Sequence, residues 1–163
     1  MTCVIRGVAV VSLAFALGCQ DSSQPGSSGR VATIPEPSAT LARESYSGFT
    51  ESTNDVINSY AEWQQAWARL YATVMPKPIL PTVDFFSDRV LLVASGQRNS
   101  GGFSIHVDSL IASDDGTTVF STFSVPGNCV VTGALTQPVH AVRVQAPKLP
   151  VSFVRQTVVQ SCA

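Results

Sequence analysis

From Arg89 onward the chain is a succession of short apolar stretches separated by Gly, Pro, Asn and Asp, and this pattern constrains the fold most strongly. Residues 89–94 are almost continuously apolar, which is typical of a strand buried on both faces. In residues 103–107 apolar and polar side chains alternate, as in a strand with one buried face. The sequence Asp114-Asp115-Gly116 indicates a hairpin turn. Further extended segments are predicted at 117–125, 129–135, 139–145 and 151–159.

One helix is predicted upstream of these strands. Ser59 and Glu62 match a capping box, in which the serine caps the helix and the glutamate reaches back. An apolar stripe at helical spacing follows and ends before Pro76. The stripe consists of Trp63, Ala66, Trp67, Leu70 and Val74. We expect the two tryptophans to lie in the core, and a surface binding face is the alternative.

The expected fold class is α+β, with a mostly antiparallel β-sheet of five to seven strands and one main amphipathic helix packed on it. A first strand is predicted at 45–51, where Tyr46 and Phe49 are the apolar anchors. A length of 163 residues with 45% hydrophobic residues fits one domain with a buried core. Only 13% of the residues are charged and the formal net charge is −1, so nucleic acid is not an expected partner.

The N-terminus has the features of an export signal. Arg6 precedes a short apolar stretch, and small residues lie near its end, which predicts a signal peptide over residues 1–18. The sequence Ala16-Leu17-Gly18-Cys19 resembles a bacterial lipobox, in which the cysteine is acylated after cleavage. We therefore expect a lipid anchor, such as palmitate, on Cys19; a plain signal peptide is the alternative. Several acyl chains would hold the protein at a membrane.

A flexible tether is predicted over residues 19–42, because this stretch is rich in Ser, Gly, Pro and Gln and has no periodicity. The folded domain is then expected at 43–163. The location that follows is the bacterial cell envelope, facing the periplasm or the cell exterior. Gln20 favours the outer membrane over the inner one.

Two cysteines remain after removal of Cys3 and acylation of Cys19. An even pair in an exported chain predicts a disulfide between Cys129 and Cys162. We expect this bond to hold the C-terminal strand to the segment near Cys129. No further ligands are spaced for a metal site, so neither a metal nor a cofactor is expected.

No catalytic constellation is evident, and we expect the protein not to be an enzyme. His106 and His140 are the only histidines, and each is expected to be a surface or half-buried strand residue. Ser100 lies in a glycine turn without an evident base. A hydrolase with an unrecognised serine–histidine pair is the alternative, since triads assemble from distant residues.

The segment from Gly96 to Val107 reads Gly-Gln-Arg-Asn-Ser-Gly-Gly-Phe-Ser-Ile-His-Val and resembles the PrcB C-terminal domain family, in which a Gly-Gly-aromatic turn, here at 96–103, links two strands. The Trp63–Trp67 helix, the Asp84-Phe85 pair and the stretch 134–140 also resemble that family, which would cover about residues 45–162. The family's aromatic is typically Tyr, whereas Phe103 stands here. The resemblance implies an exported protein that serves as an accessory subunit of a protease.

The same turn is the candidate protein-binding site. Gly101 and Gly102 could expose backbone groups and allow another chain to approach closely. Arg98 and Asn99 at the tip could add hydrogen bonds, and the full candidate set also includes Gly96, Ser100 and Phe103. The plainer alternative is a tight hairpin. A non-enzymatic, lipid-anchored protein-binding module is expected; a protease inhibitor that uses this turn, or a structural lipoprotein without a specific client, are the alternatives.

Overall fold

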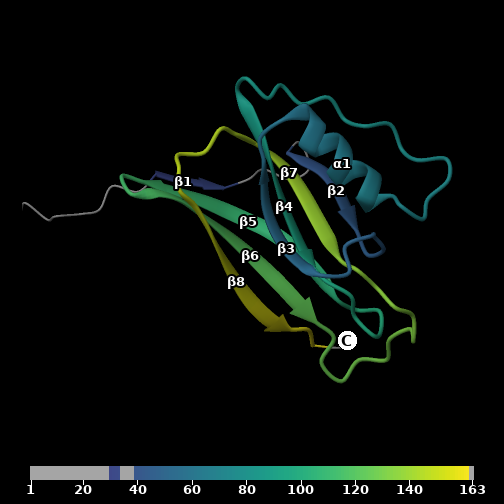
Figure 1. Ribbon diagram of the computed structural model, residues 1–163. Coiled ribbons are helices and arrows are strands. Elements are labelled where there is room, and N and C mark those ends of the chain that lie inside the picture. Colours follow the sequence, from purple (N-terminus) through teal and green to yellow (C-terminus); the bar gives the residue numbers. More distant parts are fainter. Residues whose placement is uncertain (1–29, 34–38, 162–163) are drawn as a thin grey trace, which may run out of the picture.

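The computed structural model describes residues 30–33 and 39–161 (Figure 1). Within these ranges the chain forms eight strands and one helix. The strands are β1 (Arg30–Thr33), β2 (Thr40–Glu44), β3 (Ser52–Ile57), β4 (Asp88–Ser95), β5 (Ser104–Ser113), β6 (Gly116–Val125), β7 (Val139–Gln145) and β8 (Val151–Val159). The helix, α1, spans Tyr60–Leu70.

The strands form two four-stranded sheets, one with the order β1-β5-β6-β8 and the other with the order β2-β7-β4-β3. All neighbours are antiparallel except β6 and β8, which run parallel. The prediction of a mostly antiparallel β fold with one helix is confirmed. The single sheet expected from the sequence is instead divided into two sheets, since buried clusters form on both faces of β4.

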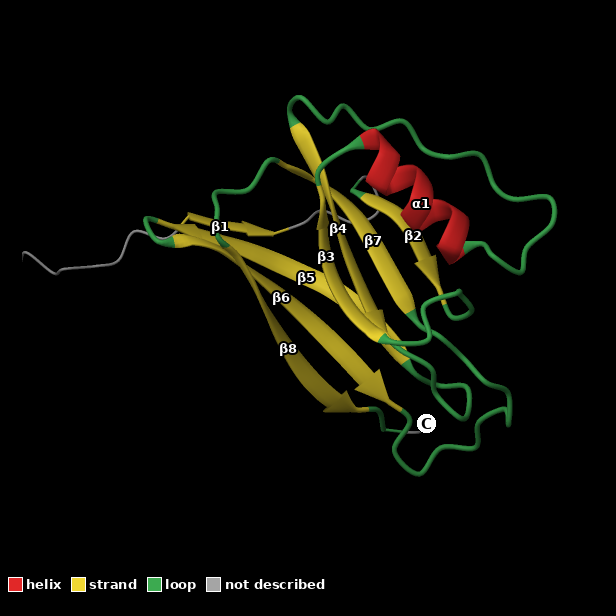
Figure 2. Cartoon of the chain, viewed as in Figure 1, coloured by secondary structure: helices red, strands yellow, loops and turns green. Residues whose placement is uncertain are grey.

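β4 is the central strand because its two faces are buried in two different cores. Val90, Leu92 and Ala94 face α1, whereas Leu91 and Val93 face the other sheet. All five side chains are fully buried. This explains why residues 89–94 read as a continuous apolar run: period-two alternation disappears when both faces lose contact with water. The layers are therefore the helix, the β4-containing sheet and the β6-containing sheet (Figure 2).

The helix begins as predicted, with Ser59 as its N-cap: the Ser59 hydroxyl accepts from the backbone N–H of Glu62 at 3.3 Å. The carboxylate of Glu62 accepts from the backbone N–H of Asn58 rather than from that of the cap, at 2.7 Å. Trp63 and Trp67 are buried in the cluster that also contains the helix-facing residues of β4. Their indole N–H groups donate to carbonyl oxygens of the proline-rich connector that follows the helix, those of Pro81 and Pro78.

Three local predictions differ from the structure. The predicted strand 45–51 is a loop between β2 and β3; Tyr46 is exposed, and Phe49 is buried beneath the guanidinium of Arg69. The predicted extended segment 129–135 is also a loop. The strand β1 lies wholly and β2 partly inside the predicted tether, where pairing with β5 and β7 outweighs the low local propensity.

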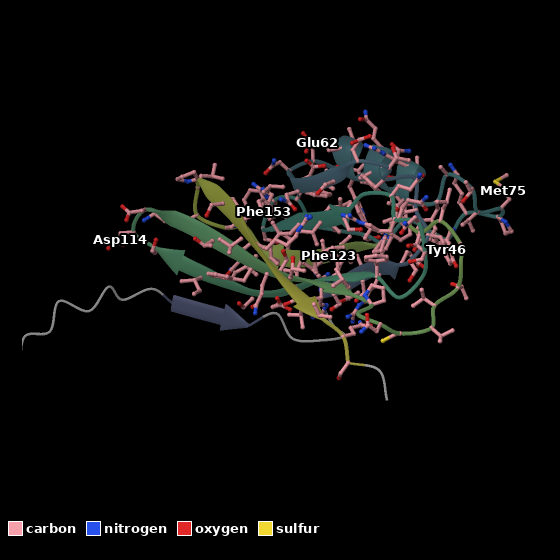
Figure 3. The ribbon with its side chains drawn as sticks, turned by 90° about the horizontal axis from the view of Figure 1, so that it is seen from below. Tyr46, Glu62, Met75, Asp114, Phe123 and Phe153 are labelled. Atoms are coloured by element: carbon pink, nitrogen blue, oxygen red, sulfur yellow. The ribbon has the colours of Figure 1, made fainter. Side chains whose placement is uncertain are left out.

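The hairpin of β5 and β6 is confirmed, with its turn at Asp114 and Asp115. In Figure 3 this turn lies at one end of the molecule, and Tyr46 and Met75 lie at the other. The turn 96–103 joins β4 to β5 at the end of β5 that is farthest from Asp114.

No helix in the described part of the chain is long and apolar enough to cross a membrane. The predicted signal peptide and Cys19 lie outside the described residues.

Candidate functional site

The turn 96–103 is built against the protein's own backbone. Gly96 has φ +76°, and a Cβ atom there would lie 2.9 Å from the backbone nitrogen of Ser52. Glycine is therefore required on two grounds, the left-handed conformation and the close approach of the chain that leads into β3. The next residue, Gln97, donates its backbone N–H to the Thr50 carbonyl at 2.9 Å. The start of the turn is thus fixed to the edge of the sheet.

The remainder of the turn is paired with the segment 126–138. Arg98 and Thr136 exchange backbone hydrogen bonds of 2.7 and 3.0 Å. The Gly101 N–H donates to the Thr132 carbonyl at 2.8 Å. A Cβ atom on Gly102, which has φ +80°, would lie 2.7 Å from side-chain atoms in this segment. The chain that approaches the glycines closely is therefore the protein's own loop, and the Gly101 N–H is already used in pairing with it.

Arg98 does not lie at the tip of the turn, as the sequence suggested. Its side chain folds back over the ring of Phe123, with the guanidinium carbon 4.7 Å from the ring centroid. The guanidinium also donates to the Ser95 carbonyl oxygen. Phe103 stacks on Phe123 with 5.9 Å between centroids. Arg98 and Phe103 thus hold the turn against the β6-containing sheet through cation–π and aromatic contacts.

The exposed residues of the turn and of segment 126–138 form what we call the loop surface. Its members are Gln97, Asn99, Gly102, Gly127, Asn128, Val130, Thr132, Gly133 and Leu135. Val130 is fully exposed and Leu135 exposes 56% of its surface. Arg98, which is folded inward, is the only charged residue in 96–103 and 126–138. The loop surface is therefore neutral and carries two solvent-facing aliphatic side chains.

The sequence interpretation missed Val130 and Leu135 because it assigned residues 129–135 to an extended segment of the sheet. Pro126, Gly127, Gly133 and Pro138 surround this stretch, and such a density of turn residues indicates a loop. Ser100 was a candidate site residue. Its carbonyl accepts from the Thr136 hydroxyl at 2.7 Å, and its own hydroxyl donates to the Gly101 carbonyl at 3.2 Å. Ser100 thus contributes to the internal pairing of the two loops.

The two histidines lie together on the opposite side of the β-sandwich from β3 and β8. The rings of His106 and His140 stack, with 4.7 Å between centroids. His140 is fully buried, in contrast to the sequence expectation of a surface or half-buried position. Its Nδ1 accepts from the Val107 backbone N–H at 2.9 Å, and its Nε2 lies 3.0 Å from the Thr40 hydroxyl oxygen.

These contacts define the state of His140. Because Nδ1 accepts a hydrogen bond from a backbone N–H, it carries no proton, and the proton of the neutral ring is on Nε2. The ring therefore donates to Thr40 and has no lone pair with which to remove a proton from that hydroxyl. Burial lowers the pKa of His140 to about 3, with further lowering by the nearby His106 and Arg43.

The predicted disulfide falls partly outside the described residues, because Cys162 is not among them. The Sγ atom of Cys129 lies 3.9 Å from the carbonyl oxygen of Gln160, two positions before Cys162. The Gln160 N–H in turn donates to the Val125 carbonyl. The C-terminal end of β8 therefore runs beside Cys129, and the pairing of the two cysteines stays a prediction. In the described part of the chain no group of three or more His, Cys, Asp or Glu residues is placed to hold a metal ion.

Residues 89–145 match the family model described as PrcB C-terminal. The match begins in β4, ends with β7 and includes the turn 96–103 and the segment 126–138. It confirms the resemblance expected from the sequence over those residues. No curated protein and no solved structure matches the chain.

Proposed function

Because residues 89–145 match the family model described as PrcB C-terminal, we propose that the protein is a non-enzymatic accessory subunit that binds and stabilises an exported protease. The family match is the observation that carries this proposal. It spans both segments of the loop surface, so that surface belongs to the part of the chain that is similar to the family. The partner surface we expect to fit is neutral and has a shallow apolar pocket.

The loop surface has the properties of a protein contact. Val130 and Leu135 are aliphatic side chains held in water at the free end of a loop whose backbone is fixed to the turn by hydrogen bonds. A pre-ordered loop loses little conformational entropy when it binds, which favours association. Because the surface carries no charge, no ionic group has to be desolvated when a partner covers it.

We further propose that Cys19 is acylated after cleavage of residues 1–18 and that the protein faces the periplasm or the cell exterior, with the outer membrane favoured. Acylation supplies lasting attachment, since each buried methylene contributes about 0.8 kcal/mol. The proposal that the protein lacks catalytic activity rests on the state of His140, which already uses both ring nitrogens.

Photo-crosslinking in cells tests the proposed partner. A photoreactive phenylalanine analogue is placed at Asn99 or Val130 on the loop surface, and at Ile79 as the matched control. Ile79 is equally exposed, at 93%, and lies in the connector that follows α1. We expect an exported protease to be trapped from the first two positions and not from Ile79. Equal trapping from all three, or trapping of other proteins only, would contradict the proposal.

The effect on the protease distinguishes the alternatives. The double variant V130D/L135D places two carboxylates on the loop surface while leaving the buried core unchanged. For a stabilising subunit, this variant shortens the lifetime of the trapped protease in the cell. For an inhibitor, it instead raises the activity of a protease whose lifetime is constant. A structural lipoprotein without a client predicts no change in either quantity.

A further inference from the structure

Within the described ranges the outer edge of β3 carries no partner strand, and it lies next to a pocket. Among the described residues β3 pairs only with β4, at one end of its sheet. A pocket of about 430 Å³ lies between this strand and the flank of α1. It is lined by Phe49, Asp55, Val56, Ile57, Glu62, Gln65, Ala66 and Arg69. The edge and the pocket together form what we call the β3 groove.

The register shows which backbone groups of β3 face outward. The Ser95 N–H donates to the Pro138 carbonyl, on the β7 side of β4. Neighbouring residues of a strand direct their backbone groups to alternate sides, so Ala94 directs its groups toward β3. Ala94 is paired with Thr53. By the same alternation, the outward-facing residues of β3 are Ser52, Asn54 and Val56.

One independent contact agrees with this assignment. The Val56 carbonyl accepts from the side-chain amide of Asn58 at 2.7 Å, which is possible only if that carbonyl faces away from β4. This bond caps one end of the edge. No strand of the described residues pairs with the N–H and C=O groups of Ser52 and Asn54 or with the N–H of Val56, so an added strand can use them. An extended peptide could therefore continue the antiparallel sheet here, as in β-strand addition.

The charges along the groove indicate what kind of peptide fits. Asp55 faces the helix side of β3, and Glu62 faces the same space from α1. Glu51, just before β3, is exposed. The only basic lining residue is Arg69, which already donates to the Gly48 carbonyl and covers the ring of Phe49. A second guanidinium, that of Arg155, contacts Ser52 and Asn54 from the face of β3 that is turned away from α1. On the helix side acidic residues outnumber basic ones, so pairing of two copies of β3 would bring like charges together there.

We propose that the β3 groove binds an extended segment of a partner protein that adds a strand antiparallel to β3 and presents a lysine or arginine to Asp55 and Glu62. Asp55 lies between two outward-facing residues, so it forms a non-hydrogen-bonded pair with the added strand, in which side chains approach most closely. A basic residue at that position would contact Asp55 directly. This inference does not depend on the proposed protease partner, because it concerns a different surface.

The test uses the full-length protein and the synthetic peptide Thr-Val-Thr-Lys-Thr-Val-Thr, blocked at both ends. A second peptide with Glu in place of Lys is the control. Titration is followed by NMR of the backbone amides. We expect the lysine peptide to bind at least tenfold more tightly and to shift the amides of residues 52, 54 and 56 most. Equal binding of the two peptides, or shifts centred elsewhere, would overturn the inference.

Two variants examine the backbone and charge contributions separately. Asn54→Pro removes one outward N–H without removing a bond to β4, because proline is tolerated on the open side of an edge strand. Asn54→Ala is its matched control, since both lose the side-chain bond to Arg155. We expect the proline variant to lose binding and the alanine variant to keep it; the same affinity in both would contradict strand addition.

The variant Asp55→Lys tests the charge contribution. We expect it to remain folded, even if the proline variant does not, and to prefer the glutamate peptide over the lysine peptide. An unchanged peptide preference would refute the charge pairing.

Discussion

His140 makes the stability of the fold sensitive to acid, and the effect can be calculated. The folded state holds this ring neutral, because burial and the neighbouring His106 and Arg43 lower its pKa to about 3. In the unfolded chain the ring returns to a pKa of about 6.5. Between these two values the unfolded state binds one more proton than the folded state. The free energy of unfolding therefore decreases as the pH falls through this interval.

The size of the effect follows from the two pKa values. Well below pH 6.5 the loss approaches about 1.4 kcal/mol per pH unit, which amounts to about 2.5 kcal/mol between pH 7 and pH 4.5. A domain of this size has a total stability on the order of 5–15 kcal/mol. The stabilising contribution is complete above pH 6.5 and is lost as the pH falls toward 3. Protonation of His140 in the unfolded chain could therefore by itself remove a large fraction of the free energy of unfolding at pH 4.5.

The perturbation is His140→Asn, in which the side-chain oxygen can still accept from the Val107 N–H but cannot be protonated in this range. At pH 7 we expect the variant to be less stable by about 1–3 kcal/mol, because the contact with Thr40 and some packing are lost. Urea unfolding is followed by the fluorescence of Trp63 and Trp67 at pH 7, 5.5 and 4.5. Carboxylates common to both proteins contribute equally, so the difference between variant and wild type isolates His140.

The expected result is that the stability difference at pH 7 shrinks by about 2.5 kcal/mol and vanishes or changes sign at pH 4.5. His106→Asn is the control, since it leaves His140 in its buried position with the Val107 bond. We expect that variant to retain most of the acid sensitivity. If His140→Asn loses as much stability between pH 7 and 4.5 as the wild type, the buried neutral imidazole is not the cause and the reasoning fails.

Two further predictions concern the backbone and the predicted disulfide. Gly116→Ala should destabilise the protein by about 2 kcal/mol or more, because φ is +139° and the new Cβ would clash with the Pro150 carbonyl oxygen. Gly133→Ala, whose Cβ would meet nothing within 4 Å, should change stability by less than about 0.5 kcal/mol in the same urea titration. Reduction of the pairing between Cys129 and Cys162 should lower the stability by about 2–4 kcal/mol, and alkylation of Cys129 in the unreduced, denatured protein would show that the bond does not exist.

Local patterns predicted the strands that carry a strong pattern of their own. The run at 89–94, the alternation at 103–107 and the turn at Asp114 depend on burial and turn chemistry within a few residues. The helix was equally accessible, because Ser59 and the tryptophan stripe specify its start and its buried face. In the strands and in the helix the spacing of apolar residues shows which faces are buried. The local sequence was therefore sufficient to predict these elements.

The features that were missed depend on contacts between distant parts of the chain. β2 lies in a stretch of low strand propensity and forms because β7 offers it a partner edge. The division into two sheets depends on which strands pair and which cover each face of β4, and no local pattern encodes it. The burial of His140 likewise depends on Val107 and Thr40, which are 33 and 100 positions away. The turn 96–103 was located correctly, but its pairing with segment 126–138 is a tertiary property.

Different contacts join the two sheets on the two sides of the β-sandwich, and these contacts differ in how far they can adjust. On one side the His140 ring bonds directly to the β5 backbone, so the sheets are joined by a short and inflexible contact. On the other, the long side chain of Arg155 reaches from β8 to Ser52 and Asn54 of β3, and burial lowers its pKa. A long flexible bridge can adjust when a strand is added beside β3, whereas the histidine contact cannot shift without losing a buried bond. A substitution at His140 should therefore reduce stability while leaving the affinity of the β3 groove for the lysine peptide unchanged, measured under conditions in which the variant is fully folded.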